Sequence, residues 1–228
     1  MKFDDYLCEC KQISKIISEN KFRYEELMNE TLEKIETQKY SFGGLYIHRG
    51  YFCPSRIVDI ISNVSRGKYS TCKKRDYTYS FDKNGLLIMV KQGKITEFIQ
   101  MEELFELGIA FCGKKDIQSV SKCEYYEDGR IKEYSYFICD SFKNKVIQMT
   151  KEKYEYTDQA IIVNYATFMQ NKQYIRKSPI LIEEQYSFEI INEHFLKYSY
   201  YQIYPKNPLS KMRYFEYTDK ESLFERFI

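Results

Sequence analysis

Apolar side chains recur at helical spacing near the start of the chain and at alternate positions farther along it. Residues 3–18 and 24–35 each carry one apolar stripe with charged residues on the other faces, which predicts two amphipathic helices arranged as a helical hairpin. Gly43-Gly44 then breaks the helical pattern, and Leu45–His48 has the pattern of a short strand. A third helix is expected from Pro54 to near Gly67, because proline suits the first turn of a helix.

From Arg75 onward apolar and polar residues alternate, which is typical of strands that bury one face. Residues 77–81 form the first such strand, and Asn84-Gly85 supplies a turn into residues 86–90. Residues 95–99 continue the pattern. Residues 101–113 fit either one or two helical turns or a strand, since periodicity alone does not resolve short apolar runs.

The stretch 122–169 carries the clearest strand pattern in the chain. It consists of runs rich in Tyr, Phe, Ile and Val that are interrupted by Asp128-Gly129 or by short clusters of Lys, Asn and Asp. Such runs predict antiparallel strands joined by tight turns, that is, a meander. A type I′ turn needs positive φ at both central residues, and Asp-Gly tolerates this at low cost, so we expect a type I′ hairpin at 128–129.

The pattern after residue 179 is less regular. Ile180–Ile182 is expected to be a strand that follows Pro179, and 187–204 is expected to be a helix followed by a strand. A last strand is predicted at 214–217. Residues 218–221 have capping-box spacing ahead of Leu223, Phe224 and Phe227, which predicts a short C-terminal helix.

Helical and alternating patterns are therefore segregated along the chain, which argues against β-α-β units and a parallel sheet. We predict an α+β fold in which N-terminal helices pack on an extended antiparallel β-meander sheet, with a short C-terminal helix. Residues 1–74 would form the helical region and residues 75–228 the meander region of one continuous domain.

Composition limits the function only weakly. The formal net charge of +2, from 35 basic and 33 acidic residues, gives no global field that would attract nucleic acid or an acidic partner. The seven cysteines have no recurring spacing, the first residues lack an apolar signal-peptide core, and no apolar run approaches the ~20 residues that span a bilayer. These features predict a cytoplasmic protein with reduced thiols.

The chain has two histidines, His48 and His194, and neither lies in a catalytic signature. Cys53 and His48 are a candidate pair, because a nearby imidazole stabilises a thiolate. The alternative, a buried and inert cysteine, is the more common case. Cys8 and Cys10 point apart on a helix and have no second Cys/His pair to complete a zinc site. Gly43-Gly44 lacks the lysine of a phosphate loop. We therefore expect no catalytic residues, no metal and no cofactor.

Two basic clusters are candidates for a nucleic-acid interface. Residues 66–75 hold five positive charges and one tyrosine, including Arg66, Lys73, Lys74 and Arg75, and residues 197–213 interleave basic and aromatic side chains without an acid. This mixture is what single-stranded nucleic-acid platforms use. The alternative is that both clusters are solvated loops beside a tyrosine-rich sheet, which the balanced total charge favours.

Two hairpin motifs carry a family resemblance. Residues 81–86 (Phe-Asp-Lys-Asn-Gly-Leu) and 126–131 (Tyr-Glu-Asp-Gly-Arg-Ile) resemble the Tyr-Asp-x-x-Gly hairpins of YD-type β-meander repeats. Similar hairpins occur in some small cytosolic immunity proteins encoded beside bacterial polymorphic toxins. Two further aromatic pairs, in 154–156 and 215–217, precede apolar runs at uneven spacing and lack the glycine. The resemblance covers two short motifs and implies no site residues.

The function expected from the sequence is non-enzymatic protein binding, as an immunity protein or inhibitor that neutralises a toxin or effector by direct contact. Tyrosine and arginine are favoured at interface hot spots, and the chain has 23 tyrosines. The expected contacts on a cognate protein are Tyr134, Tyr136, Tyr198, Tyr200 and Tyr201, together with the basic residues at 66 and 73–75. The alternatives are a nucleic-acid or nucleotide-binding module that uses the two basic clusters, and an adaptor inside a larger assembly. No membrane partner is expected.

Overall fold

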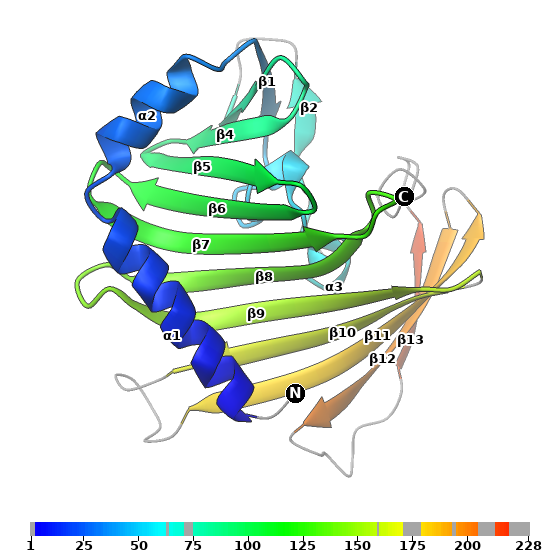
Figure 1. The fold of residues 1–228 in the computed structure, drawn as a ribbon. Helices are drawn as coiled ribbons and strands as arrows, with labels where there is room; N and C mark the ends of the chain where they lie inside the picture. Colours follow the sequence, from blue (N-terminus) through cyan, green and yellow to red (C-terminus); the bar gives the residue numbers. More distant parts are fainter. Residues whose placement is uncertain are drawn as a thin grey trace.

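The fold is built on one open antiparallel sheet of 13 strands (Figure 1). The computed structural model describes residues 3–62, 64–70, 75–158, 160–170, 179–192, 195–204 and 213–218. The helices are α1 (Phe3–Asn20), α2 (Tyr24–Leu32), the 3-10 helix η1 (Gly50–Phe52) and α3 (Val58–Ser62). The strands are β1 (Thr37–Phe42), β2 (Lys68–Ser70), β3 (Tyr77–Phe81), β4 (Leu87–Gln92), β5 (Ile95–Glu102), β6 (Phe105–Cys112), β7 (Asp116–Tyr125), β8 (Ile131–Asp140), β9 (Lys145–Tyr156), β10 (Ala160–Met169), β11 (Ile180–Asn192), β12 (Phe195–Tyr204) and β13 (Arg213–Thr218).

Strand order follows chain order from β3 to β13, with each strand paired antiparallel to the next. At the other end of the sheet, β1 pairs with β3, and β2 pairs with β1 to form the edge. The predicted α+β class and antiparallel sheet are confirmed. The region 1–74 is not purely helical, however, because it also contributes β1 and β2 to the same sheet.

Helix α1 crosses one face of the sheet because its apolar residues share one side. Tyr6, Cys10, Ile13 and Ile17 are buried, and their spacing of three or four residues places them in one stripe. The Tyr6 ring stacks on Phe168 of β10 with centroids 5.9 Å apart. Helix α2 continues this layer, and both helices share a core with the inward side chains of β4 to β11. We call this face of the sheet the helix face.

An ion pair also holds α1 to the sheet. Lys151 of β9 is buried, and its Nζ lies 2.8 Å from Glu9 of α1 and 2.5 Å from Glu133 of β8. Burial alone would lower the pKa of Lys151, but the two carboxylates raise it, and the net pKa is raised. The ammonium therefore keeps its charge under the helix.

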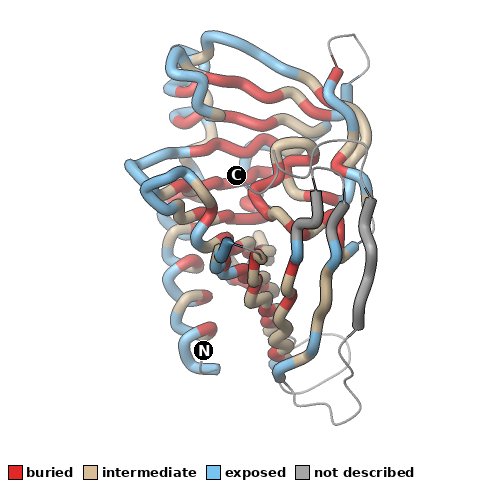
Figure 2. Tube along the Cα trace, turned by 90° about the vertical axis from the view of Figure 1, so that its right-hand side faces the viewer, coloured by how far each residue is buried: buried red, intermediate tan, exposed pale blue. Residues whose placement is uncertain are grey.

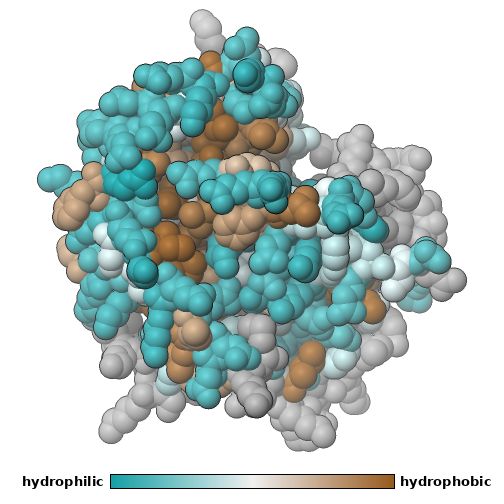
Figure 3. Space-filling model, in the orientation of Figure 1, coloured by the Kyte–Doolittle hydropathy of each residue, from teal (hydrophilic) through white to brown (hydrophobic). Residues whose placement is uncertain are grey.

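Alternation along the strands gives the sheet two buried faces. In β8, Phe137 packs with the helices, whereas Tyr134 packs in a separate cluster on the opposite face. In β5, Phe98 faces the helices and Ile99 faces away. Buried residues accordingly run along most strands in Figure 2, and exposed residues gather in the turns. The surface seen from the helix side is mostly hydrophilic, with hydrophobic atoms visible in a band over the upper strands (Figure 3).

The two glycine turns exist, but the type I′ geometry predicted at 128–129 is wrong. Gly129 N donates to Tyr126 O at 2.9 Å, and only the glycine of this turn has positive φ, at 83°. Gly85 makes the equivalent bond to Asp82 O at 3.0 Å, with φ of 78°. A single left-handed glycine after a type I turn is the three-residue hairpin with a bulge. The glycine is the third residue of each three-residue loop, and it alone takes the positive φ. The residue before it keeps a negative φ, which excludes a type I′ turn.

Three predicted elements differ from the structure. Leu45–His48 forms turns and the strand lies earlier, at β1, because Gly43 and Gly44 both have positive φ and end the extended chain. The third helix is shorter than predicted, because only α3, Val58–Ser62, is helical in the stretch expected to run from Pro54 to near Gly67. The helix expected after Ser187 is wrong, because β11 runs on to Asn192 and pairs along its length with β10 and β12. The predicted C-terminal helix lies outside the described residues.

We expect Ile13→Ala to lower the free energy of unfolding by about 2–5 kcal/mol, because it opens a cavity under α1 where Ile13 is 1% exposed. The matched control is Lys15→Ala on the same helix, whose side chain is 78% exposed and should change stability little. Urea unfolding followed by circular dichroism measures both variants. Equal losses for the two variants would contradict the packing of α1 on the sheet.

Candidate functional site

Residues 43–67 cross the sheet on the face opposite to α1 and α2 (Figure 1). This segment, which connects β1 to β2, contains η1 and α3, and Ile57 and Ile60 pack in the cluster on that face. We call it the crossing segment, and the face that it covers the crossing face. Polar side chains hold it at two places, one around Arg49 and one around Arg66.

Arg49 is the first anchor. Its side chain is 1% exposed, and Nη1 donates to Glu106 of β6 at 2.6 Å. Nη2 donates to Glu97 of β5 at 2.8 Å and to Ser121 of β7 at 3.0 Å. Burial alone would lower the pKa of Arg49, but the two carboxylates outweigh it, and the net pKa is raised well above the ordinary value. One guanidinium thus joins the crossing segment to three adjacent strands.

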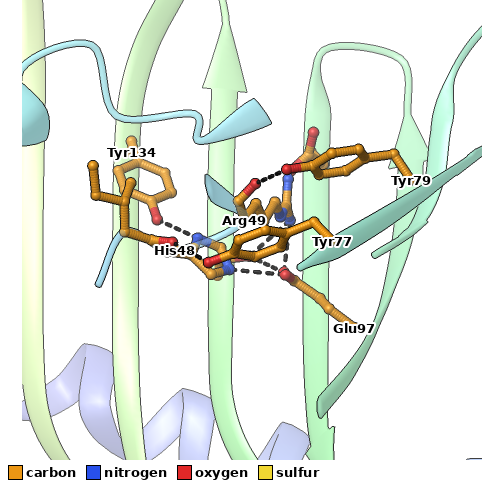
Figure 4. A network of polar contacts seen from close by, with 9 residues as sticks. His48, Arg49, Tyr77, Tyr79, Glu97 and Tyr134 are labelled. Atoms are coloured by element: carbon orange, nitrogen blue, oxygen red, sulfur yellow. Dashed lines mark hydrogen bonds and ion pairs between the residues drawn. The ribbon is translucent and has the colours of Figure 1, made fainter. Parts of the chain in front are cut away.

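The backbone at Arg49 is also held by hydrogen bonds. Its φ is 58°, in the left-handed region that non-glycine residues seldom adopt. The Tyr79 hydroxyl donates to Arg49 O at 2.9 Å (Figure 4). The Tyr77 hydroxyl donates to Gly44 O at 2.9 Å. Such strain persists only where the surroundings fix the conformation. The two tyrosines of β3 supply part of that constraint.

His48 completes the network, and both of its ring nitrogens are engaged. Nε2 lies 2.8 Å from Glu97 Oε2, and Nδ1 lies 2.7 Å from the Tyr134 hydroxyl (Figure 4). Burial alone would raise the pKa of Glu97, but Arg49 and then His48 outweigh it, so the net pKa is lowered and the carboxylate is ionised. An ionised carboxylate only accepts hydrogen bonds. In the neutral ring, therefore, Nε2–H donates to Glu97, and Nδ1 accepts from Tyr134.

Gly108 of β6 makes room for this network. A Cβ atom at this position would overlap Glu97 Oε1, Ser121 Oγ and Arg49 Nη2. Glycine inside a strand commonly marks the close approach of another group. Here that group is the guanidinium of Arg49 together with its partners.

Arg66 is the second anchor. It is buried, its Nε lies 3.0 Å from Asp59 Oδ2, and its Nη1 donates to Cys53 O at 2.9 Å. Ser55 Oγ donates to Glu152 of β9 at 2.7 Å and also accepts from Val58 N at 3.0 Å, at the start of α3. The short helix is thus tied to the sheet through its first turn.

Glu152 is a buried carboxyl group within this second anchor. Burial raises its pKa to about 7, although hydrogen bonds from Tyr154 and Ser55 act in the opposite direction. The Tyr154 hydroxyl donates to Glu152 Oε2 and accepts from Arg56 N at 2.9 Å. The folded protein therefore retains a proton on Glu152 at pH values where an exposed glutamate is ionised.

The buried thiols do not have the low pKa of reactive cysteines. Burial raises the pKa of Cys53, Cys123 and Cys139 to about 12, and that of Cys10 to about 11. A thiol with such a pKa stays protonated at neutral pH and is a poor nucleophile. The ring nitrogens of His48 bond to Glu97 and Tyr134, so the suggested Cys53–His48 pair has no support in this geometry.

A small pocket lies beside His48 between the crossing segment and strands β3 to β8. Its volume is about 190 Å³. Leu45 and Tyr46 are exposed at this pocket, with 90% of Tyr46 accessible. The walls are mainly polar and aromatic, and include Glu97, Gln118, Ser119 and Tyr136.

The structure separates the predicted contact residues. Tyr134 is buried in the His48 network, and Tyr136 is partly buried with its ring 4.4 Å from the His48 ring. Tyr198 and Tyr200 of β12 are partly buried against Phe188 and Tyr186 on the crossing face. Tyr201 is 38% exposed and donates to Gln185 on the helix face. Four of the five tyrosines therefore belong to one cluster on the crossing face, where they are buried or partly buried, and Tyr201 lies on the opposite face.

The basic cluster is also divided. Arg66 is buried in its ion pair with Asp59, so its charge is not offered to a ligand. Arg75 is exposed and lies over the Tyr40 ring, 4.9 Å from its centroid. Lys73, Lys74 and His194 lie outside the described residues, as does the loop between β12 and β13, residues 205–212.

Sequence reasoning missed the residues that organise this site, namely Arg49, Glu97, Glu106 and Glu152. The sequence did contain one signal of this site. Gly108 interrupts the apolar run of β6, and a glycine inside a strand indicates that another group approaches the backbone closely. Within the described ranges, no group of three or more His, Cys, Asp or Glu side chains could hold a metal ion. No described helix combines the length and apolarity needed to cross a membrane.

We expect Gly108→Ala to lower the free energy of unfolding by about 3–5 kcal/mol, the usual effect of breaking a buried ion pair. Ala110→Gly, on the same strand and face, is the control and should cost about 1 kcal/mol through backbone entropy. Urea unfolding of the two variants gives the comparison. A loss in Gly108→Ala no larger than that of the control would show that the ion network does not fill this space.

Glu152 predicts a specific dependence of stability on pH. Its pKa is raised from an ordinary 4.5 to about 7 in the folded state, so its contribution is fully present below about pH 4.5 and is lost as pH rises through 7. The unfolding free energy of the wild type relative to Glu152→Gln should fall by an amount on the order of 3 kcal/mol across this window. Glu155→Gln, an exposed change on the same strand, should give a flat difference. A flat difference for Glu152→Gln would contradict the buried, protonated state.

The comparisons with known proteins add no family to this geometry. No family model, no curated protein and no solved structure compared with the chain matches it. The function is therefore argued from the residues described above.

Proposed function

We propose that this protein acts by binding another protein without catalysis, as an immunity protein or inhibitor that blocks a toxin or effector by direct contact. The observation that carries the proposal is the position of Tyr46. Its ring is 90% exposed, two residues before His48 and three before Arg49, where the chain is held by buried hydrogen bonds and ion pairs. A large aromatic residue is thus presented to solvent on a segment with little freedom to move.

Rigid presentation favours binding because fewer degrees of freedom are lost when a complex forms. Tyrosine is enriched at interface hot spots because it combines a large contact area with a polar hydroxyl group. Leu45 is 52% exposed and extends the same surface. Exposed apolar groups on a tightly held segment add little to stability, and a contact surface gives them a use.

The chemistry of the anchors supports a binding role. Both nitrogens of the His48 ring and both terminal nitrogens of Arg49 bond within the protein. Of the groups that could act as a base or nucleophile here, His48 is used to hold the crossing segment, and Cys53 stays protonated because burial raises its pKa to about 12. The polar network thus has a structural use that needs no substrate.

The alternative function is a module that binds nucleic acid. One of the basic residues expected to contact phosphate, Arg66, is instead paired with Asp59 inside the fold. The described part of the first basic cluster leaves Lys68 and Arg75 exposed. The net charge of +2 also lacks the strong basic bias expected of a protein that binds nucleic acid. We therefore favour a protein partner.

We expect Tyr46→Ala to weaken binding to the cognate protein at least tenfold, about 1.4 kcal/mol, while leaving the melting temperature unchanged. Phe22→Ala is the matched control, because Phe22 is 84% exposed in the turn between α1 and α2. The partner is sought as the product of a neighbouring gene, and as a stoichiometric protein that co-purifies from the native host.

The functional readout is growth of cells that express the neighbouring gene. Wild-type protein and Phe22→Ala should restore growth, and Tyr46→Ala should restore it less well at equal expression. If Tyr46→Ala protects fully, Tyr46 is not the contact. If nucleic acid co-purifies instead and is released steeply by salt, phosphate contacts dominate and the proposal is wrong.

A further inference from the structure

The pocket beside His48 has a chemical preference that identifies part of the partner. We propose that it receives a basic side chain, a lysine or an arginine, of the bound protein. This inference rests on the proposed function, because it concerns the same surface around Tyr46. It adds the kind of side chain that the partner would place in this pocket.

Size limits the occupant to about one side chain. The volume of about 190 Å³ is below the roughly 300–1,000 Å³ that small-molecule and cofactor sites have. The pocket opens beside Tyr46 and Leu45, which are exposed and would surround an inserted side chain with apolar contacts. A rim that excludes water from a central anchor is the usual arrangement at interface hot spots.

The walls offer hydrogen-bond acceptors to a cation. Glu97 is ionised and lines the pocket together with Arg49 and with Gln92, Gln118 and Ser119. The side chains of the last three each carry an oxygen that can accept a hydrogen bond. An ammonium group brings three donors and a guanidinium group brings five, and neither has an acceptor. The donors of such a group match the acceptors in these walls.

The net charge of the buried network also favours a cation over an anion in the pocket. When the His48 ring is neutral, the network contains one guanidinium, Arg49, and two carboxylates, Glu97 and Glu106, which leaves one excess negative charge. The terminal nitrogens of Arg49 are directed at these carboxylates and at Ser121, so they are not available to an anion. An anionic ligand would therefore lie beside Glu97 without a free cation to compensate.

Aromatic rings add to the attraction. Tyr46, Tyr77 and Tyr136 all line the pocket. The face of an aromatic ring attracts a cation, and several rings around one site form the cage that binds ammonium groups. A neutral apolar side chain would gain contact area here but would bring no hydrogen-bond donor to the polar residues that line the pocket.

The first test uses the pocket without its partner. n-Butylammonium chloride imitates a lysine side chain, and sodium butyrate is an anion of the same length. His48 ring signals are followed by NMR in the His194→Gln variant, because the chain has two histidines. We expect saturable shifts of the His48 signals with butylammonium in the millimolar range and none with butyrate. Equal or larger shifts with butyrate, or no shift with either, would overturn the proposal.

The second test changes the charge at the mouth of the pocket. Gln118 is exposed, so Gln118→Lys and Gln118→Glu should both fold. We expect Gln118→Lys to weaken butylammonium binding at least tenfold and Gln118→Glu to preserve or strengthen it. The same two changes at Gln100, which is exposed on β5 and lies on the helix face with Phe98, control for total charge. If the Gln118 pair behaves like the Gln100 pair, the pocket does not select a cation.

The cognate protein separates this inference from the proposed function. If Tyr46→Ala abolishes protection while Gln118→Lys and Gln118→Glu protect equally, the protein is a binder and the basic-side-chain proposal is wrong. If butylammonium binds as expected but Tyr46→Ala protects fully, the cation site stands and Tyr46 is not the partner contact. Loss of protection in Gln118→Lys alone supports both.

Discussion

The ion pairs of the Arg49 guanidinium are the contacts on which the crossing face of this protein depends. A charge with 1% of its side chain exposed is tolerable only because two carboxylates and a hydroxyl accept its hydrogen bonds. Those acceptors come from three adjacent strands, so Arg49 can be satisfied only after β5, β6 and β7 have paired. The crossing segment is therefore fixed by the completed sheet and in turn covers it.

Both faces of the sheet contain buried ion pairs, but they differ in how much of their packing is polar. On the helix face, α1 and α2 bury an apolar stripe, and the contacts are mainly between aliphatic and aromatic side chains. On the crossing face, apolar clusters are interrupted by Arg49, Arg66 and Glu152, each of which is hydrogen-bonded. Apolar packing tolerates small changes in orientation, whereas ion pairs require fixed distances and angles. The second face thus gives the crossing segment one defined position.

This difference explains why the candidate binding surface lies on the crossing segment. A contact residue is most effective when its backbone is already in the bound conformation. The left-handed backbone of Arg49, the bonds from Tyr77 and Tyr79, and the engaged His48 ring together provide that order around Tyr46. The same network supplies the carboxylate and the aromatic walls of the neighbouring pocket. The structural role and the proposed binding role therefore fall on one set of residues.

The sequence by itself determined the local elements. The stripe of Tyr6, Cys10, Ile13 and Ile17 defines α1, and the alternation from Tyr77 onward defines an antiparallel meander, because both periods follow from backbone geometry. Only the tertiary structure decided that β1 pairs with β3, and that Ser187 continues a strand because β10 and β12 are its neighbours. It also decided the site, since Arg49 meets Glu97 and Glu106 across 48 and 57 positions of the chain. Periodicity records which residues are buried, but it does not record which buried charges will meet, because that depends on how distant strands are placed.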